Sequence, residues 1–369
     1  MEIIGKNKGL GIAFVPTNLC DRDCGHCLSS ANKDNCLFLG QDSQQMLSEE
    51  MAKANLYYDI VFTGNGEPIM CPSLPTITEG FLNDTRCRSV VLKTSGVLTD
   101  AHAERERLLA VLSSGRVELD VSFNLYADFP ERLLSTLKLI FNETNIEKMD
   151  VILDFDRSNL WETHTAFLDV IDKFIEDSPE FIDLTVSKFI TDKEFFAWVL
   201  KNFDLHSHIP KQAGIITMNA LMKQDVTYQL ARTNGNRKLE IVIKPDGISN
   251  MGRARNLKGT VPSVYPCKIL KQPKKSAQGK IITLGATLAP DGNFYPCVKC
   301  GMQEEVRLGT LGKTPMEEIL YRVKVFRYRM PDYVEGFYFQ ILNSKDPCAV
   351  CKYFSKIYLQ KEWRNRDSP

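Results

Sequence analysis

Three cysteines lie close together near the amino terminus, in the segment Cys20-Asp-Arg-Asp-Cys24-Gly-His-Cys27. Thiolates are soft ligands that bind zinc or iron–sulfur clusters equally well. Three on one short loop can bind three irons of a cubic four-iron cluster, which leaves the fourth iron open to a small molecule with an amine and a carboxylate. Structural zinc needs four protein ligands, and Cys36 is a better fourth ligand than His26, which adjoins Cys27. The spacing therefore predicts a metal site but does not decide between zinc and an iron–sulfur cluster.

The chain has 11 cysteines, and they fall into two groups along the sequence. The groups are Cys20, Cys24, Cys27, Cys36, Cys71 and Cys87, and then Cys267, Cys297, Cys300, Cys348 and Cys351. In a reducing compartment such a pattern binds metal or does chemistry more often than it forms disulfides. Two groups predict two sites, and for the second group a zinc ribbon is the alternative to an iron–sulfur cluster.

Polar and glycine-rich segments follow the next predicted strands. Gly64-Asn65-Gly66-Glu67-Pro68 ends the second strand, Thr94 ends the third, and Ser122 and Asn124 end the fourth. Glycines let a backbone approach a ligand closely, and acceptors on such a loop can bind an ammonium group. The alternative is that these are ordinary polar residues at strand ends.

Short β-branched runs alternate with amphipathic helical patterns from residue 11 to about 203. Strands are expected at Ile12–Val15, Ile60–Thr63, Ser89–Lys93, Val117–Phe123, Met149–Phe155 and Phe181–Ser187, and helices at Asp42–Asn55, Ser73–Leu82, Asp100–Leu112, Pro130–Phe141, Thr163–Glu176 and Asp192–Phe203. Six strand–helix repeats predict an α/β fold with a parallel sheet, either open or a partial barrel. In such folds ligands bind at the carboxyl ends of the strands, where all the segments above are expected.

The regular alternation of strand and helix patterns ends at about residue 205. A strand is expected at Leu239–Ile243, and a hairpin at Lys280–Leu288 and Asn293–Tyr295 around Asp291-Gly292. A helix is expected after Thr314 as N-cap, with Glu317 closing a capping box, and to run to about Arg329. We therefore expect two domains, residues 1–237 and 238–369.

The composition limits the classes of function. Lys and Arg together number 46, as do Asp and Glu, so the chain lacks the basic excess of a general nucleic-acid binder. The longest apolar run near the start, Leu10–Pro16, is too short to span a membrane and has no signal-peptide flanks. We expect a cytoplasmic protein without membrane or general nucleic-acid partners.

The motifs together resemble the radical S-adenosylmethionine (SAM) superfamily. Cys20, Cys24 and Cys27 match its C-x3-C-x2-C pattern after the first strand, although His26 stands where the family usually has an aromatic residue. Gly64–Pro68 is similar to its Gly-Gly-Glu-Pro element, and the segment at Thr94 to a weaker Thr-Asn-Gly element. The resemblance implies a partial (β/α)6 barrel whose three cysteines bind a [4Fe-4S] cluster that also binds SAM. It implies SAM contacts at Gly64, Asn65, Gly66, Glu67, Pro68, Thr94, Ser122 and Asn124.

The second cysteine group resembles the SPASM and twitch extensions of that superfamily. The shared features are Cys267, the Gly-x4-Cys of Gly292 and Cys297, and the pair Cys348 and Cys351. Five cysteines fit the shorter twitch type, a smaller α+β domain with one auxiliary [4Fe-4S] cluster. The resemblance implies Cys267, Cys297, Cys348 and Cys351 as its ligands, with Cys300 able to replace one of them.

The resemblance also implies an activity. The enzyme cleaves SAM reductively to a 5′-deoxyadenosyl radical, which abstracts a hydrogen atom from a peptide, a protein or a small metabolite. The auxiliary cluster implies net oxidation by dehydrogenation or crosslink formation, with electrons from a donor such as flavodoxin or ferredoxin. Because the motif begins at residue 20, we expect no leader-binding domain before it. The alternatives are a radical SAM epimerase with Cys71 as hydrogen donor, and a non-catalytic zinc or iron–sulfur protein.

Overall fold

The computed structural model describes thirteen parts of the 369-residue chain. They are residues 9–22, 24, 36–96, 104–125, 129–155, 160–178, 181–187, 226–232, 238–247, 274–275, 281–298, 302–336 and 349–356. The predicted helix at Asp192–Phe203 lies outside these ranges.

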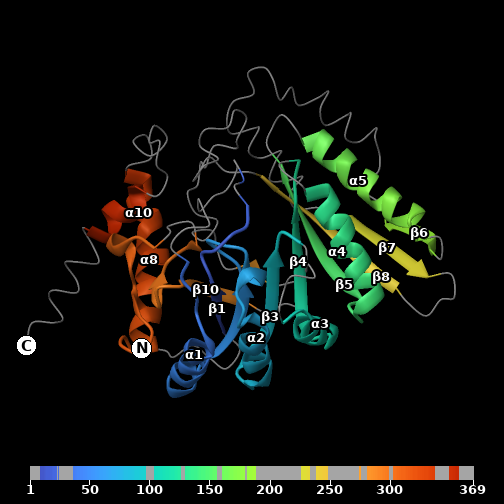
Figure 1. The fold of residues 1–369 in the computed structure, drawn as a ribbon. Helices are drawn as coiled ribbons and strands as arrows, with labels where there is room; N and C mark the ends of the chain where they lie inside the picture. The colour runs from blue at the N-terminus through green and yellow to red at the C-terminus, as the bar shows by residue number, and fades with distance from the viewer. Residues whose placement is uncertain are drawn as a thin grey trace, which may run out of the picture.

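A single twisted sheet runs through the described residues (Figure 1). Its strands are β1 (Gly9–Phe14), β2 (Tyr57–Phe62), β3 (Cys87–Thr94), β4 (Val117–Phe123), β5 (Lys148–Phe155), β6 (Phe181–Ser187), β7 (Val226–Arg232), β8 (Lys238–Gly247), β9 (Lys274–Lys275), β10 (Ile281–Leu288), β11 (Asn293–Tyr295) and β12 (Gly309–Thr310). The order is β12-β11-β10-β1-β2-β3-β4-β5-β8-β7-β6, with β9 beside β10. Strands β10, β1 to β5 and β8 are parallel, and the described strands do not close into a barrel. The predicted α/β class with a parallel sheet, open or a partial barrel, is confirmed.

The sixth strand differs from its predicted role. The bounds predicted for β6 are correct, but β6 pairs antiparallel with β7 at the edge of the sheet. Strand β7 pairs antiparallel with β8, and β8 takes the parallel position beside β5. The strand–helix alternation predicts that a strand exists there, but pairing depends on a strand some forty residues further along the chain.

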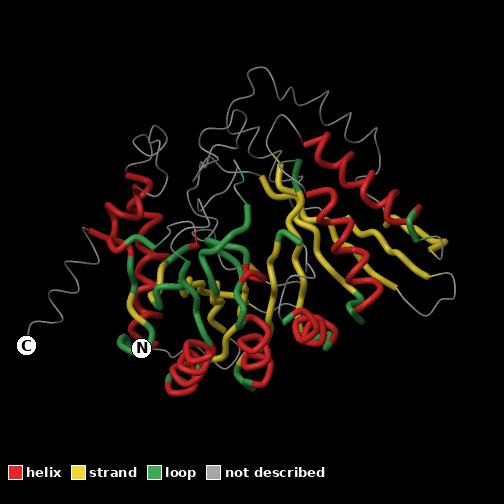
Figure 2. The backbone as a smooth tube through the Cα atoms, viewed as in Figure 1, coloured by secondary structure: helices red, strands yellow, loops and turns green. Residues whose placement is uncertain are grey.

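The helices cover the faces of the sheet (Figure 2). They are α1 (Gln41–Lys53), α2 (Leu74–Asn83), α3 (Arg105–Ser113), α4 (Phe129–Glu143), α5 (Leu160–Glu176), α8 (Met316–Gly336) and α10 (Ala349–Phe354), with 3-10 turns η1 (Pro68–Met70) and η5 (Glu304–Val306). Helices α1 to α4 each connect two neighbouring parallel strands, from β1 to β5, and α5 connects β5 to β6. Gly115, after α3, has a φ of +68°, the left-handed conformation that ends many helices.

Aromatic rings fix the ends of the first two strands. Phe14 and Phe62 are the last residues of β1 and β2, and their rings meet edge to face with centroids 5.6 Å apart. Phe81 of α2 packs against both, at 5.3 Å and 6.1 Å. All three are fully buried, so the points where the next two loops leave the sheet are rigid.

The carboxyl-terminal part joins the same sheet. Strand β10 pairs in parallel with β1, and the hairpin from β10 to β11 turns at Gly292, which has the predicted positive φ of +75°. The hydroxyl of Tyr295 donates to Asp291 across this turn at 2.7 Å. Strands from both sides of residue 238 thus share one sheet, and the division at 237/238 stays a prediction.

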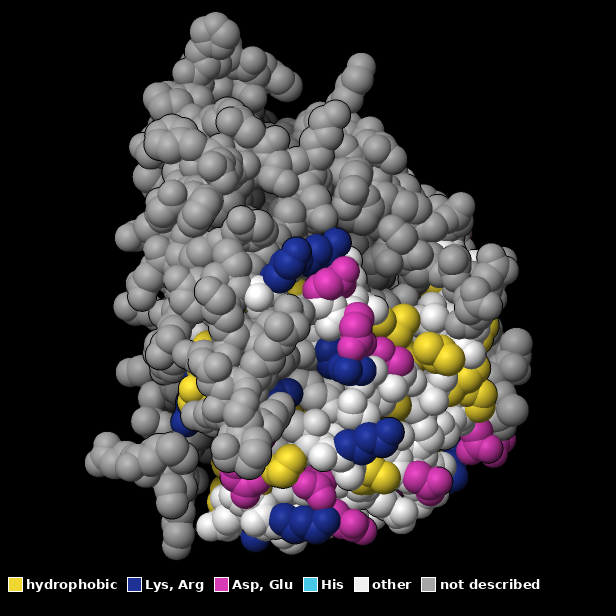
Figure 3. Space-filling view, turned by 90° about the vertical axis from the view of Figure 1, so that its left-hand side faces the viewer, with side chains coloured by type: hydrophobic (Ala, Val, Ile, Leu, Met, Phe, Trp, Pro, Cys, Tyr) yellow, Lys and Arg dark blue, Asp and Glu magenta, His cyan; other side chains and the backbone are white. Residues whose placement is uncertain are grey.

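Neither the face drawn in Figure 3 nor the described helices show a strong bias in charge or hydrophobicity. On the face in Figure 3, basic and acidic side chains of the described residues alternate without gathering into one large patch of either sign. Among the described helices none has a stretch long and apolar enough to cross a bilayer.

Candidate functional site

The segment that carries the first cysteines leaves the sheet after β1 and returns at α1. Residues 17–19 and 37–39 pair at its base, which we call the neck. The Leu39 N–H donates to the Pro16 carbonyl at 2.8 Å, and the Leu37 N–H donates to Asn18 Oδ1 at 2.7 Å. The Thr17 hydroxyl donates to the Leu37 carbonyl at 2.9 Å. The neck therefore fixes where the loop from Cys20 to Cys36 begins and ends.

The structure describes two of the three predicted ligands of the first site. Cys20 and Cys24 are half-buried, and Cys27 lies outside the described residues. Burial raises the pKa of the Cys20 thiol to about 11, while a hydrogen bond from the Arg22 backbone N–H opposes this shift. A metal ion must therefore displace the proton from Cys20, as thiolate ligation requires. Cys36, the alternative zinc ligand, is exposed beside the neck.

The loop after β2 lies directly on the neck. The Glu67 backbone N–H donates to the Leu19 carbonyl at 2.8 Å. At Gly66, a Cβ atom would lie 2.5 Å from the carbonyl oxygens of both Thr17 and Leu19. Such a separation is far inside van der Waals contact, so only glycine permits this approach. The contact joins two of the motifs found in the sequence.

Gly64 and Pro68 shape the two ends of the same loop. Gly64 has a φ of +133°, and a Cβ there would lie 2.4 Å from the Val15 side chain. Pro68 is buried and begins η1. The space beside Gly64 and Gly66 is thus filled by the chain itself. The glycines bring the loop onto the segment after β1, whereas the sequence interpretation assigned them to close approach of a ligand.

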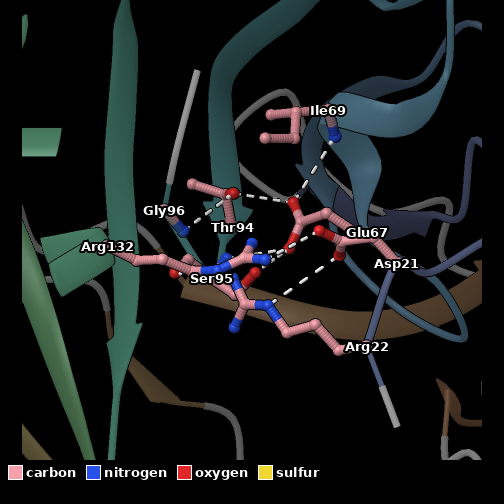
Figure 4. A network of polar contacts seen from close by, with 8 residues as sticks. All are labelled: Asp21, Arg22, Glu67, Ile69, Thr94, Ser95, Gly96 and Arg132. Carbon is pink, nitrogen blue, oxygen red and sulfur yellow. Dashed lines mark hydrogen bonds and ion pairs between the residues drawn. The ribbon is translucent and has the colours of Figure 1, made fainter. Parts of the chain in front are cut away.

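The Glu67 carboxylate connects this loop to the end of β3 (Figure 4). Only 5% of Glu67 is exposed. Its Oε1 accepts from the Thr94 hydroxyl at 2.6 Å and from the Ile69 N–H at 3.5 Å. Its Oε2 accepts from the Ser95 N–H at 2.9 Å and also from the Ser95 hydroxyl. Both oxygens are therefore occupied by neutral donors, and the side chain positions the loops.

The remaining predicted contacts lie at the same edge of the sheet. The Thr94 hydroxyl donates to Glu67 Oε1 and accepts from the Gly96 N–H at 3.2 Å. It therefore supports the loop that follows β3. Ser122 is half-buried within β4, and Asn124 is fully buried directly after it. Because β1 to β4 are parallel, their carboxyl ends meet at one edge, and the predicted grouping of these segments is confirmed.

Arg22, between Cys20 and Cys24, is a residue of this site that the sequence interpretation missed. Only 7% of Arg22 is exposed, and its Nη2 donates to the Ser95 carbonyl at 3.0 Å. Its guanidinium lies over the Phe129 ring, 4.3 Å from the centroid. Asp21 lies 3.8 Å from Nε and accepts from Arg132 at 2.9 Å. The presence of a charged residue between two cysteines of the predicted metal site could have indicated from the sequence that Arg22 belongs to the site.

Cys71 is fully buried. Its sulfur lies 3.4 Å from the Ser73 hydroxyl and 3.8 Å from the Leu39 carbonyl at the neck, and burial raises the pKa of its thiol. These contacts are those of a packed core thiol.

The second cysteine group is described in part. Cys297 and Cys351 are buried, and Cys267, Cys300 and Cys348 lie outside the described residues. Helix α10, which carries Cys351, packs on α8 through Phe354 and Phe326, with centroids 5.2 Å apart. The Ser355 hydroxyl donates to the Glu305 carbonyl in η5, seven to nine residues after Cys297 in the chain. Helix α10 is thus packed on α8 and on the turn η5 that follows Cys297 in the chain.

No family model matches the sequence, and no curated protein matches it. Among solved structures, BtrN in complex with AdoMet and 2-DOIA is similar with 13% identity and a TM-score of 0.42, over 86% of this chain and 85% of that chain. Streptococcus suis SuiB bound to S-adenosylmethionine is similar with 11% identity and a TM-score of 0.46, over 87% of this chain and 66% of that chain. TM-scores this low do not establish a common fold, so the site is interpreted from the residues of this chain alone.

Asn65 and the cysteines show which group the site fits. Asn65 is 7% exposed, and its buried Oδ1 accepts no hydrogen bond from the described residues. A buried acceptor without a donor is costly, so a ligand with an ammonium group would stabilise it. Among the described residues no three metal-ligating side chains are grouped, and Cys27 lies outside that search. The described part of the site thus holds two half-buried thiols and one buried acceptor without a donor.

We expect Gly66→Ala to separate the two loops. Its Cβ would meet two backbone oxygens that cannot rotate away, so the free energy of unfolding should fall by about 3 kcal/mol, the upper end of overpacking costs. Chemical denaturation measures this, and iron content after anaerobic reconstitution should fall with it. Gly40→Ala is the control, because no atom lies within 4 Å of its Cβ position and the cost should stay below about 1 kcal/mol. Equal stability of the two variants would contradict the loop contact.

Proposed function

We propose that this chain is a radical SAM enzyme whose catalytic [4Fe-4S] cluster is bound by Cys20, Cys24 and Cys27. The observation that supports this most is the contact of the Glu67 loop with the neck, through the Glu67 N–H on the Leu19 carbonyl. It brings the segment that leads into Cys20 and the Gly-Asn-Gly-Glu-Pro loop together at the carboxyl edge of a parallel sheet.

The residues of this site fit both a [4Fe-4S] cluster and SAM. Three thiolates leave one iron of a cubic cluster without a protein ligand. Asn65 Oδ1 is a buried acceptor suited to an N–H of the amino group of SAM. When bound, the cluster and SAM together supply a 5′-deoxyadenosyl radical that takes a hydrogen atom from the substrate. The protein's own part is to hold the loops, to bind the amino-acid end and to exclude water.

The Glu67 network performs the first of these tasks. Its carboxylate binds Thr94 and Ser95 from β3 while its backbone binds the neck. The Arg22 N–H donates to the Cys20 sulfur, which favours the thiolate form over the thiol. We place Ser122 and Asn124, from β4, on the side of the site that faces the rest of SAM.

We propose net oxidation as the reaction, with a peptide, a protein or a small metabolite as substrate and flavodoxin or ferredoxin as electron donor. Cys297 and Cys351 are each buried, which supports a second metal centre in the carboxyl-terminal part of the chain. The epimerase alternative requires a donor thiol that reaches the substrate, and complete burial of Cys71 gives it no support.

Removing one thiolate from the first site tests the proposed function. Cys24→Ala should lose the catalytic cluster and all release of 5′-deoxyadenosine from SAM after reduction, because two thiolates cannot retain the cluster with its open iron. Cys36→Ala, on the exposed side of the neck, should keep both. Iron analysis and chromatography of the reduced, anaerobically reconstituted proteins measure this. A colourless zinc-loaded protein without SAM cleavage would instead establish the non-catalytic metal protein.

Iron content separates the second proposed cluster from the first. The wild-type chain should hold about eight irons, as expected for two [4Fe-4S] clusters, and Cys351→Ala about four with SAM cleavage retained. The control is Cys87→Ala, whose thiol has a pKa raised by burial to about 12 and belongs to neither site. About four irons in the wild type, unchanged by Cys351→Ala, would rule out the auxiliary cluster and keep the enzyme.

A further inference from the structure

We infer that Arg22 is the receptor for the carboxylate of the amino-acid end of SAM. This inference rests on the proposed function and adds a specificity-determining residue to it. It follows from the hydrogen bonds that the Arg22 guanidinium makes and from those that it lacks.

The guanidinium is buried with part of its donor capacity unused. Nη2 donates to the Ser95 carbonyl, but Nε and Nη1 have no hydrogen-bond acceptor among the described residues. A buried cation costs several kcal/mol unless it is paired and hydrogen-bonded. Two buried nitrogens without acceptors therefore call for an anionic acceptor at this position.

The neighbouring groups of the protein do not meet this need. Asp21 is 3.8 Å from Nε, beyond hydrogen-bond distance, and its other oxygen is the acceptor for Arg132. The carboxylate of Glu67 is already occupied by the donors from Ser95, Thr94 and Ile69.

The Phe129 ring fixes the guanidinium without satisfying it. A ring face at 4.3 Å stabilises the positive charge, but it is no acceptor for N–H groups that point outward in the guanidinium plane. The side chain is thus held in place from one face while Nε and Nη1 stay available at its edge. A pre-positioned arginine of this kind binds a carboxylate with little loss of conformational entropy.

Of the groups in SAM only the carboxylate is an anion, while the sulfonium is a cation that Arg22 repels. The donors of Arg22 and the acceptor of Asn65 are opposite in kind, as the carboxylate and the amino group of an amino acid require. Their loops are joined at the neck by the bond from the Glu67 N–H to the Leu19 carbonyl. The two residues together distinguish an α-amino acid from an amine.

Binding of SAM and decarboxylated SAM to the reconstituted enzyme, measured by equilibrium dialysis, tests this role. Arg22→Gln should weaken SAM binding at least about tenfold, the loss expected for a charge-assisted hydrogen bond, and leave decarboxylated SAM unchanged. Arg22→Lys should recover part of the loss because it keeps the charge. Arg107→Gln, which removes an exposed arginine paired with Glu79, is the control and should change neither affinity.

Five results would overturn the inference. Equal binding of SAM and decarboxylated SAM by the wild-type enzyme would overturn the inference. This result needs no variant, so it holds even if Arg22→Gln fails to fold. Equal weakening of both ligands in Arg22→Gln would show that Arg22 only positions the loop. A changed cluster potential with an unchanged affinity ratio would assign the guanidinium to the cluster. Binding of neither ligand by the iron-loaded wild type would refute the proposed function as well, whereas tight SAM binding that Arg22→Gln leaves intact would refute this inference alone.

Discussion

The buried carboxylate of Glu67 is the contact on which the arrangement of the site depends. It accepts four hydrogen bonds from Ile69, Thr94 and Ser95, while its own backbone binds the chain that leaves β1. Glu67 therefore joins three consecutive strand ends, binding the end of β3 through its carboxylate and the segment after β1 through its backbone N–H. Each donor would cost about 1–3 kcal/mol if it were left buried without an acceptor, so the loops cannot separate one at a time. The Ser95 carbonyl also accepts from Arg22, which extends the same network to the cysteine loop.

Much of the fold was predictable because it depends on local patterns. The bounds of β4, β6 and β11 agree with those expected from the sequence, and the strand–helix alternation correctly indicated that β1 to β5 are parallel. The edge position of β6 was not predictable from its own residues. Its neighbour β7 begins at Val226, and strand pairing over such separations is set by tertiary contacts that no local pattern contains.

The roles of residues within the site were less predictable than their location. The strand-end rule placed Glu67 and Thr94 at the correct edge, but it could not show that they bind each other. Gly66 was assigned to a ligand, yet its missing side chain makes room for the carbonyls of Thr17 and Leu19. Arg22 contacts Ser95, 73 residues further along the chain, so its burial becomes visible only in the folded protein.

The central claim is that a cluster on the loop after β1 has an open iron that binds SAM. Electron paramagnetic resonance of the reduced, reconstituted protein, recorded with and without SAM, tests it most directly. The account predicts that SAM changes the signal of one cluster, because its amino and carboxylate groups bind the iron that no cysteine occupies, and that Cys24→Ala lacks the responsive signal. An identical spectrum with and without SAM, or a protein that takes up zinc and no iron, would contradict it.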